Sequence, residues 1–205
     1  MFRTVAASLL ALSFACLADA RRADAAPLPL PQVDFALKAK VQQGVAMDLA
    51  QSGARLRIHL SGGKLPAPVL GIVDLRSYKM IMMLPDMPGS AVEAEVPPEY
   101  RRAFPRGEGE PVGADQVAGN PCDVWRVEKS ADLQTPAFVC ITPDGIPLRT
   151  EIESKGQRQL VYEATSLTRA PQPASLFAPP PGTQILKVPP GAANLLPGLG
   201  KLLKN

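Results

Sequence analysis

Few side chains in this sequence have the type and spacing that reaction chemistry requires. The chain has a single histidine, His59, so a histidine-based zinc site or a nucleophile–histidine pair would depend on that residue alone. In the stretch ARLRIHL, His59 shares a predicted solvated strand face with Arg55 and Arg57. The carboxylates Glu108 and Glu110 lie in a segment rich in proline and glycine that offers no apolar pocket. No glycine-rich dinucleotide-binding or phosphate-binding motif is present. We therefore expect no catalytic residue, no metal site and no cofactor, and a protein that is not an enzyme.

The methionines of the run KMIMML are the most informative candidates. If the run is a strand, Met80 and Met82 share one face with Leu84, while Ile81 and Met83 lie on the other. Three interpretations stay open. The methionines could fill a core, form an adaptable wall for acyl chains, since thioether side chains repack easily, or bind Cu(I) through Met-x-Met spacing. No histidine or free cysteine nearby supports the copper interpretation.

The cysteines predict one disulfide. The chain has three cysteines, and Cys16 lies in a predicted export signal, which leaves Cys122 and Cys140. These two lie at equal distances from Ala131, the midpoint of a predicted hairpin, so we expect them directly opposite each other, near disulfide separation. The same hairpin places Trp125 on the other face. A structural bond is expected, because a redox pair would more often be spaced C-x-x-C.

The first residues, MFRTVAASLLALSFACLADA, have the form of a secretory signal. Cleavage is expected after Ala25, with Ala20 as the alternative, and the apolar run is too short to span about 30 Å of hydrocarbon. A soluble periplasmic protein follows from this prediction. An outer-membrane lipoprotein acylated at Cys16 is the less favoured alternative.

Composition and turn chemistry predict a mainly β domain. The 23 prolines and 16 glycines favour short strands with many turns. The centre is a four-strand meander, with six further strands before and after it. The meander strands are Cys122–Glu128, Ala137–Thr142, Pro147–Glu153 and Arg158–Thr168; the others are Val33–Gln43, Val45–Ala50, Arg55–Ser61, Val69–Asp74, Lys79–Leu84 and Thr183–Val188.

The remaining segments complete the expected organisation. Residues 1–25 are the signal, 26–188 a single β-rich domain, and 189–205 an amphipathic or disordered tail. Pro85–Gly119 lacks sustained periodicity and is expected to be a long loop acting as a lid, with one or two helical turns at Glu99–Phe104. Ala174–Phe177 is expected to turn briefly. The net charge of +3 is too small and too evenly spread to indicate nucleic acid binding.

Four stretches carry a resemblance to a known family: GNPCDVWRV, VCITPDGIPLR, ATSLTRAPQPASLFAPPPG and GIVDLRSYKMIMMLPD. They resemble a family of bacterial periplasmic proteins of unknown function that is similar to the LolA/LolB-like lipoprotein-carrier superfamily. The resemblance implies an unclosed antiparallel half-barrel with a concave apolar face, lidded by short helices or a loop. It also implies carriage of acyl chains or sensing of envelope components. No site residue transfers from the carriers.

These observations favour a non-enzymatic periplasmic protein that binds an apolar or lipid-like ligand, such as an acyl chain, a lipid or a lipoprotein. The candidate ligand-binding residues are Met80, Met82, Met83 and Trp125. The alternative is an envelope module that binds or senses another protein and takes no small ligand. In either case contact with a membrane would be peripheral at most.

Overall fold

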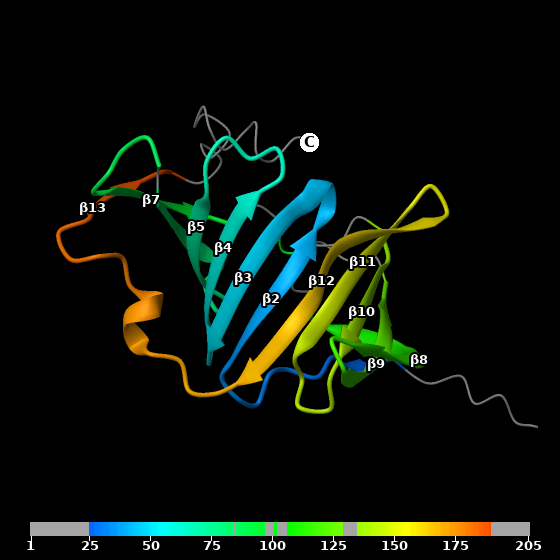
Figure 1. Ribbon diagram of the computed structural model, residues 1–205. Coiled ribbons are helices and arrows are strands. Elements are labelled where there is room, and N and C mark those ends of the chain that lie inside the picture. Colours follow the sequence, from blue (N-terminus) through cyan, green and yellow to red (C-terminus); the bar gives the residue numbers. More distant parts are fainter. Residues whose placement is uncertain (1–24, 84, 97–100, 102–105, 129–134, 190–205) are drawn as a thin grey trace, which may run out of the picture.

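The computed structural model describes residues 25–83, 85–96, 101, 106–128 and 135–189. More than half of them belong to one sheet with the strand order β1-β8-β9-β10-β11-β12-β2-β3-β4-β5-β6-β7-β13 (Figure 1). The strands are β1 (Ala26–Pro27), β2 (Phe35–Val41), β3 (Val45–Ser52), β4 (Arg55–Gly62), β5 (Val69–Asp74), β6 (Lys79–Met83), β7 (Ser90–Glu95), β8 (Glu108–Val117), β9 (Asn120–Val127), β10 (Ala137–Ile141), β11 (Pro147–Ser154), β12 (Gln157–Arg169) and β13 (Gln184–Lys187). Neighbouring strands run antiparallel, except that β13 runs parallel to β7.

The sheet is an unclosed half-barrel, as the sequence predicted. Its largest core cluster joins Leu37 and Leu49 of β2 and β3 to Val117, Val124 and Phe138 of β8, β9 and β10. These strands lie far apart in the sheet order, so only the concave side of a curved sheet brings their side chains together. The first and last strands, β1 and β13, do not pair with each other, so the barrel stays open (Figure 1).

Two smaller apolar clusters lie on the opposite face of the sheet. One contains Trp125 and Val139 of β9 and β10, and is covered by Leu28, which follows β1. The other forms where the short 3-10 helix η2 (Ala174–Phe177) inserts Phe177 between Ala50 and Ile72. The helical turn that the sequence predicted at these residues is therefore confirmed, and its role is to cover the outer face of β3 and β5.

The predicted strands are confirmed to within two residues at each end, but the long loop predicted at Pro85–Gly119 is wrong. This segment contains β7 and β8. In β7, Val92 and Ala94 alternate with glutamates, and the alternation is weak because alanine adds little apolar area. Strand β8 has no apolar periodicity of its own and forms because it pairs with β9. Of the predicted helical turns at Glu99–Phe104, only Arg101 lies within the described residues.

The hairpin of β9 and β10 contains the predicted disulfide between Cys122 and Cys140, with Cα atoms 5.4 Å apart. The predicted sorting of faces is confirmed, since both cysteines belong to the concave core and Trp125 to the outer cluster. The predicted register is wrong, because Val124 and not Cys122 is paired with Cys140. The bond thus joins diagonal neighbours. The predicted midpoint of the hairpin, Ala131, lies outside the described residues.

The chain before β2 crosses the outer face of the sheet as an N-terminal strap. Ala26 and Pro27 pair with Gly109 and Glu108 of β8, and the Leu28 N–H donates to the Gly107 carbonyl (2.8 Å). Further along, the Gln32 N–H donates to the Asp144 carbonyl. The predicted signal at 1–25 and the predicted tail at 189–205 lie outside the described residues, except for Ala25 and Pro189. Among those described, no helix is long and apolar enough to cross a membrane.

Candidate ligand-binding face

The concave face changes from fully buried to half-buried along its strands. In β2, Phe35 is 1% exposed, whereas Val41 at the other end of the strand is half-buried. In β4, Leu56 is fully buried, whereas Ile58 and Leu60 are half-buried. Because side chains two residues apart lie on the same strand face, each strand carries one continuous apolar row. One end of the core is therefore closed, and the other offers apolar surface to solvent.

Seven half-buried residues pack against this core, and we call five of them the concave patch: Val41, Ile58, Leu60, Met80 and Val161. The other two are Tyr78, in the turn before β6, and Leu167, which pairs with Leu37. The patch residues come from β2, β4, β6 and β12, so the patch lies on the part of the sheet between β12 and β6. Gly71 of β5 pairs with Ile58 of β4 and has no side chain of its own. The Met80 side chain covers this space, because its sulfur lies 3.5 Å from the position that a Cβ on Gly71 would occupy. No member of the patch carries a charge.

The structure separates the four residues that the sequence singled out as ligand-binding. Met80 belongs to the concave patch, and Met82 lies on the same face but is only 6% exposed. Met83 lies on the outer face beside the η2 cluster, and Trp125 belongs to the outer cluster under Leu28. The predicted division of the methionines between two faces is confirmed. Met80 and Met82, the pair with Met-x-Met spacing, share the concave face, and Met83 lies on the other.

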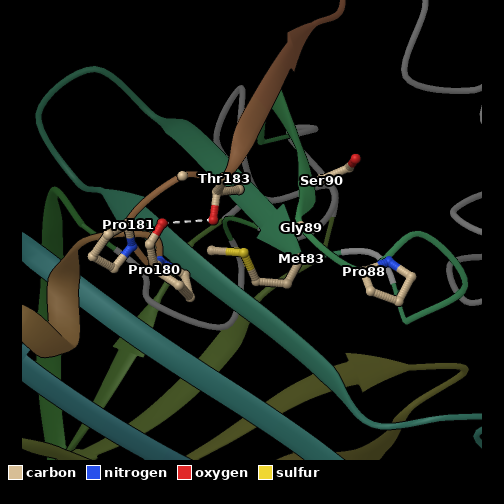
Figure 2. Close-up of a pocket in the computed structure, with 8 residues that line it drawn as sticks. Met83, Pro88, Gly89, Ser90, Pro180, Pro181 and Thr183 are labelled. Carbon is tan, nitrogen blue, oxygen red and sulfur yellow. Dashed lines mark hydrogen bonds between the residues drawn. The ribbon is translucent and has the colours of Figure 1, made fainter.

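Met83 instead lines a pocket of about 290 Å³ at the edge of the sheet. Figure 2 shows Met83 between two prolines of the segment before β13, Pro180 and Pro181, and the turn before β7 that contains Pro88. Thr183 closes the segment by donating its hydroxyl hydrogen to the Pro180 carbonyl (2.7 Å). The pocket is lined mainly by apolar atoms and has no charged side chain among its lining residues.

The Trp125 indole Nε1–H is buried without a hydrogen-bond acceptor among the described residues. Its neighbours across the ladder are Pro111 of β8 and Val139 of β10, and neither side chain can accept a hydrogen bond. Trp125 therefore contributes apolar area to the cluster under the strap and leaves one donor unused.

His59 lies on the outer face with its Nδ1 3.7 Å from an Asp48 carboxylate oxygen, and both side chains are partly exposed. This is a surface contact of small energetic weight. Among the described residues, no group of three or more histidine, cysteine, aspartate or glutamate side chains could hold a metal ion.

Polar side chains hold the β8–β9 hairpin against the later strands. Arg149 of β11 contacts Asp115 of β8 (2.6 Å) and Glu163 of β12 (3.7 Å). Hydrogen bonds from Arg149 and from the Gln116 backbone lower the pKa of Asp115. Burial disfavours the charged form of Arg149, but these carboxylates raise its pKa overall. The network keeps one wall of the concave core in place.

Sequence reasoning missed four members of the concave patch: Val41, Ile58, Leu60 and Val161. Alternation assigned the first three to a core face, but it carries no information on which end of that face stays open. The dense methionine run drew attention to β6, although β6 contributes only Met80 to the patch.

No protein-family model and no curated protein matches this chain. Solved structures share its fold at low sequence identity. An uncharacterized conserved protein from Thermus thermophilus matches with a TM-score of 0.55 and 10% identity over 76% of this chain and 91% of that one. PNGF-II matches with a TM-score of 0.50 and 11% identity, over 80% of this chain but 32% of that one. MucB in its complex with MucA from Pseudomonas aeruginosa matches with a TM-score of 0.43 and 18% identity, over 77% of this chain and 59% of that one.

Proposed function

We propose that this protein is a non-enzymatic periplasmic binding protein that holds an apolar chain, such as the acyl chain of a lipid or lipoprotein, on its concave patch. The observation that carries the proposal is the change in burial along β2 and β4, which leaves an uncharged apolar surface continuous with a closed core. Exposed apolar surface of this kind usually marks a binding site, because leaving it in water costs free energy.

The chemistry of the patch favours a hydrocarbon ligand. All five side chains are aliphatic or thioether, so they offer neither a hydrogen-bond donor nor a strong acceptor. Each methylene transferred from water contributes about 0.8 kcal/mol. A chain of roughly ten methylenes therefore contributes about 8 kcal/mol before the costs of ordering, so a dissociation constant of about 1 μM is the tightest that this term alone allows. Met80 adds an adaptable side chain that suits a ligand without fixed shape.

A fluorescent fatty acid tests the proposal on the delipidated protein. Leu60→Asp places a charge in the patch and should weaken binding by tenfold or more, since about 1.4 kcal/mol gives that factor. Leu70→Asp is the matched control, because Leu70 is also half-buried and lies on the outer face opposite His59. Met80→Leu should leave binding nearly unchanged, because volume and polarity are kept.

Equal losses in Leu60→Asp and Leu70→Asp would contradict the proposed location. Absence of any binding by the unmutated protein would reject the lipid proposal and favour the alternative of an envelope protein-binding module. Circular dichroism of each variant separates loss of binding from loss of fold.

Export to the periplasm is the second part of the proposal. Its support is that the first described strand begins at Ala26, so cleavage after Ala25 removes none of the described strands. The intact mass of the protein purified from a bacterial periplasm should match a chain beginning near Ala26 with no acyl addition. A diacylated chain beginning at Cys16 would instead identify an anchored lipoprotein.

A further inference from the structure

Strand β13 forms an exposed edge of the sheet. All four of its residues are exposed, including Ile185 (40%) and Leu186 (48%), and among the described residues it has one strand neighbour, β7. The Gln184 N–H donates to the carbonyl of Gly89, just before β7, and the Val188 N–H donates to the carbonyl of Glu93 in β7 (2.8 and 2.9 Å).

The backbone groups available on this edge follow from that pattern. In a parallel ladder, every second residue directs its N–H and C=O toward the same neighbour. Because the backbone groups of Gln184 and Val188 point toward β7, those of Leu186, midway between them, do so too. The backbone groups of Ile185 and Lys187 therefore point away from β7. The free edge therefore offers two N–H and two C=O groups.

Within the part of the chain that the structure describes, the other edge of the sheet is protected, and β13 is not. Strand β8 carries Pro111, a bulge between Pro111 and Gly113, and the acidic residues Glu110 and Asp115, and its first residues are covered by β1. Proline, bulges and charges are the usual means by which edge strands avoid pairing with other chains. Strand β13 has no proline and no bulge, and its one charge is Lys187.

We propose that β13 pairs with β13 of a second copy of this chain, antiparallel about a two-fold axis at Leu186. In this register Ile185 of each copy lies opposite Lys187 of the other, so both outward residues form hydrogen-bonded pairs and the two lysines avoid each other. Leu186 of one copy lies opposite Leu186 of the other, as a close pair of aliphatic side chains on one face. A strand that meets its own copy about a two-fold axis is necessarily antiparallel, which agrees with this geometry.

The pairing is expected to be weak. Four residues on each side bury less than the roughly 1,200 Å² of a stable interface, so the dissociation constant should be on the order of 0.1 mM. Such a dimer would join two half-barrels edge to edge and leave both concave patches open. The inference is therefore independent of the proposed ligand.

Analytical ultracentrifugation of the full-length protein tests the inference over a range from about 10 μM to about 1 mM. Unmutated protein should shift from monomer toward dimer. Leu186→Lys and Leu186→Glu place like charges opposite each other and should each weaken the dimer at least tenfold. An equimolar mixture of the two variants should dimerise again, because opposite charges then meet. Leu186 is exposed, so neither change should disturb the fold.

A second pair of variants tests the register. Ile185→Pro removes an outward N–H and should weaken the dimer, whereas Ile185→Val keeps that N–H and should not. Three results would overturn the inference: a monomer at every concentration, no recovery in the charge-swapped mixture, or slow exchange of the Ile185 and Lys187 amides in the dilute monomer. The last result would mean that the edge is already covered within one molecule.

Discussion

At the scale of single residues, Asp144 is the carboxylate on which most polar contacts of the β10–β11 turn converge. It accepts hydrogen bonds from Arg169 Nε (2.6 Å) and Nη2 (3.0 Å) and from the Thr142 hydroxyl (2.6 Å). These bonds, with that from Arg169 the strongest, hold the pKa of Asp144 down at about 2, although burial opposes the shift. The carboxylate thus joins the turn to the end of β12.

The stability of the fold should therefore depend on the charge of Asp144. Its pKa in the folded protein lies below its unfolded value of 3.8, so its contribution is present above pH 4 and is lost as the pH falls toward 2. Because the pair is partly exposed, about 1 kcal/mol is expected after allowance for solvent screening. Urea unfolding of Asp144→Asn at pH 7 and at pH 2.5 should show this loss at pH 7 and a smaller loss at pH 2.5, which lies between the folded and unfolded pKa values.

Arg169→Gln provides the control, because it removes the partner and leaves the carboxylate. The double variant should lose less stability than the sum of the two single variants, as expected for residues that interact directly. If the free energy of unfolding of Asp144→Asn differs from that of the unmutated protein by the same amount at both pH values, the effect does not come from the charge of Asp144.

At the scale of elements, the N-terminal strap and the β10–β11 turn meet at Gly145. This glycine has φ +83°, and a Cβ there would overlap the Leu30 carbonyl. Gly145→Ala should therefore push the strap away from the sheet and uncover the cluster that Leu28 closes. Burial of a leucine contributes about 2 kcal/mol, so a loss of this size is expected in addition to the backbone strain.

Gly119→Ala is the matched control for that strain. Gly119 has a similar φ of +75°, but no atom lies within 4 Å of the place of its Cβ. Urea unfolding should show a larger loss for Gly145→Ala than for Gly119→Ala. Equal losses would mean that the strap contributes no stability through this contact.

At the scale of the whole molecule, the concave core joins both halves of the sheet. This core contains residues of β2–β4 from one half and residues of β8–β12 from the other. Neither half keeps a closed core when the other unfolds. We expect one cooperative thermal transition. The chain has a single tryptophan, Trp125 on β9, which reports on one half, whereas circular dichroism reports on all strands.

The fluorescence and circular dichroism curves should share one midpoint. Two separate midpoints would show that the halves unfold independently. Reduction of the Cys122–Cys140 bond should lower both midpoints together, by an amount that corresponds to about 3 kcal/mol for a loop of this length.

The amino-acid sequence was sufficient to predict ten of the strands and the faces of most of them. Alternation at Phe35, Leu37 and Ala39, or at Leu56, Ile58 and Leu60, is a local property, so it can be read without the fold. The cysteine pairing was also predicted correctly, because setting aside Cys16 left only Cys122 and Cys140, although the register expected for their hairpin was wrong.

Only the tertiary structure decided the rest. Strand β8 forms because β9 lies beside it, and its own residues favour a loop. The concave patch depends on where the two halves of the sheet meet, which leaves Leu56 covered and Leu60 half-exposed although both occupy one strand face. Strand periodicity depends on neighbours along the chain, whereas solvent exposure depends on strands distant in sequence, and a local pattern carries no information about those.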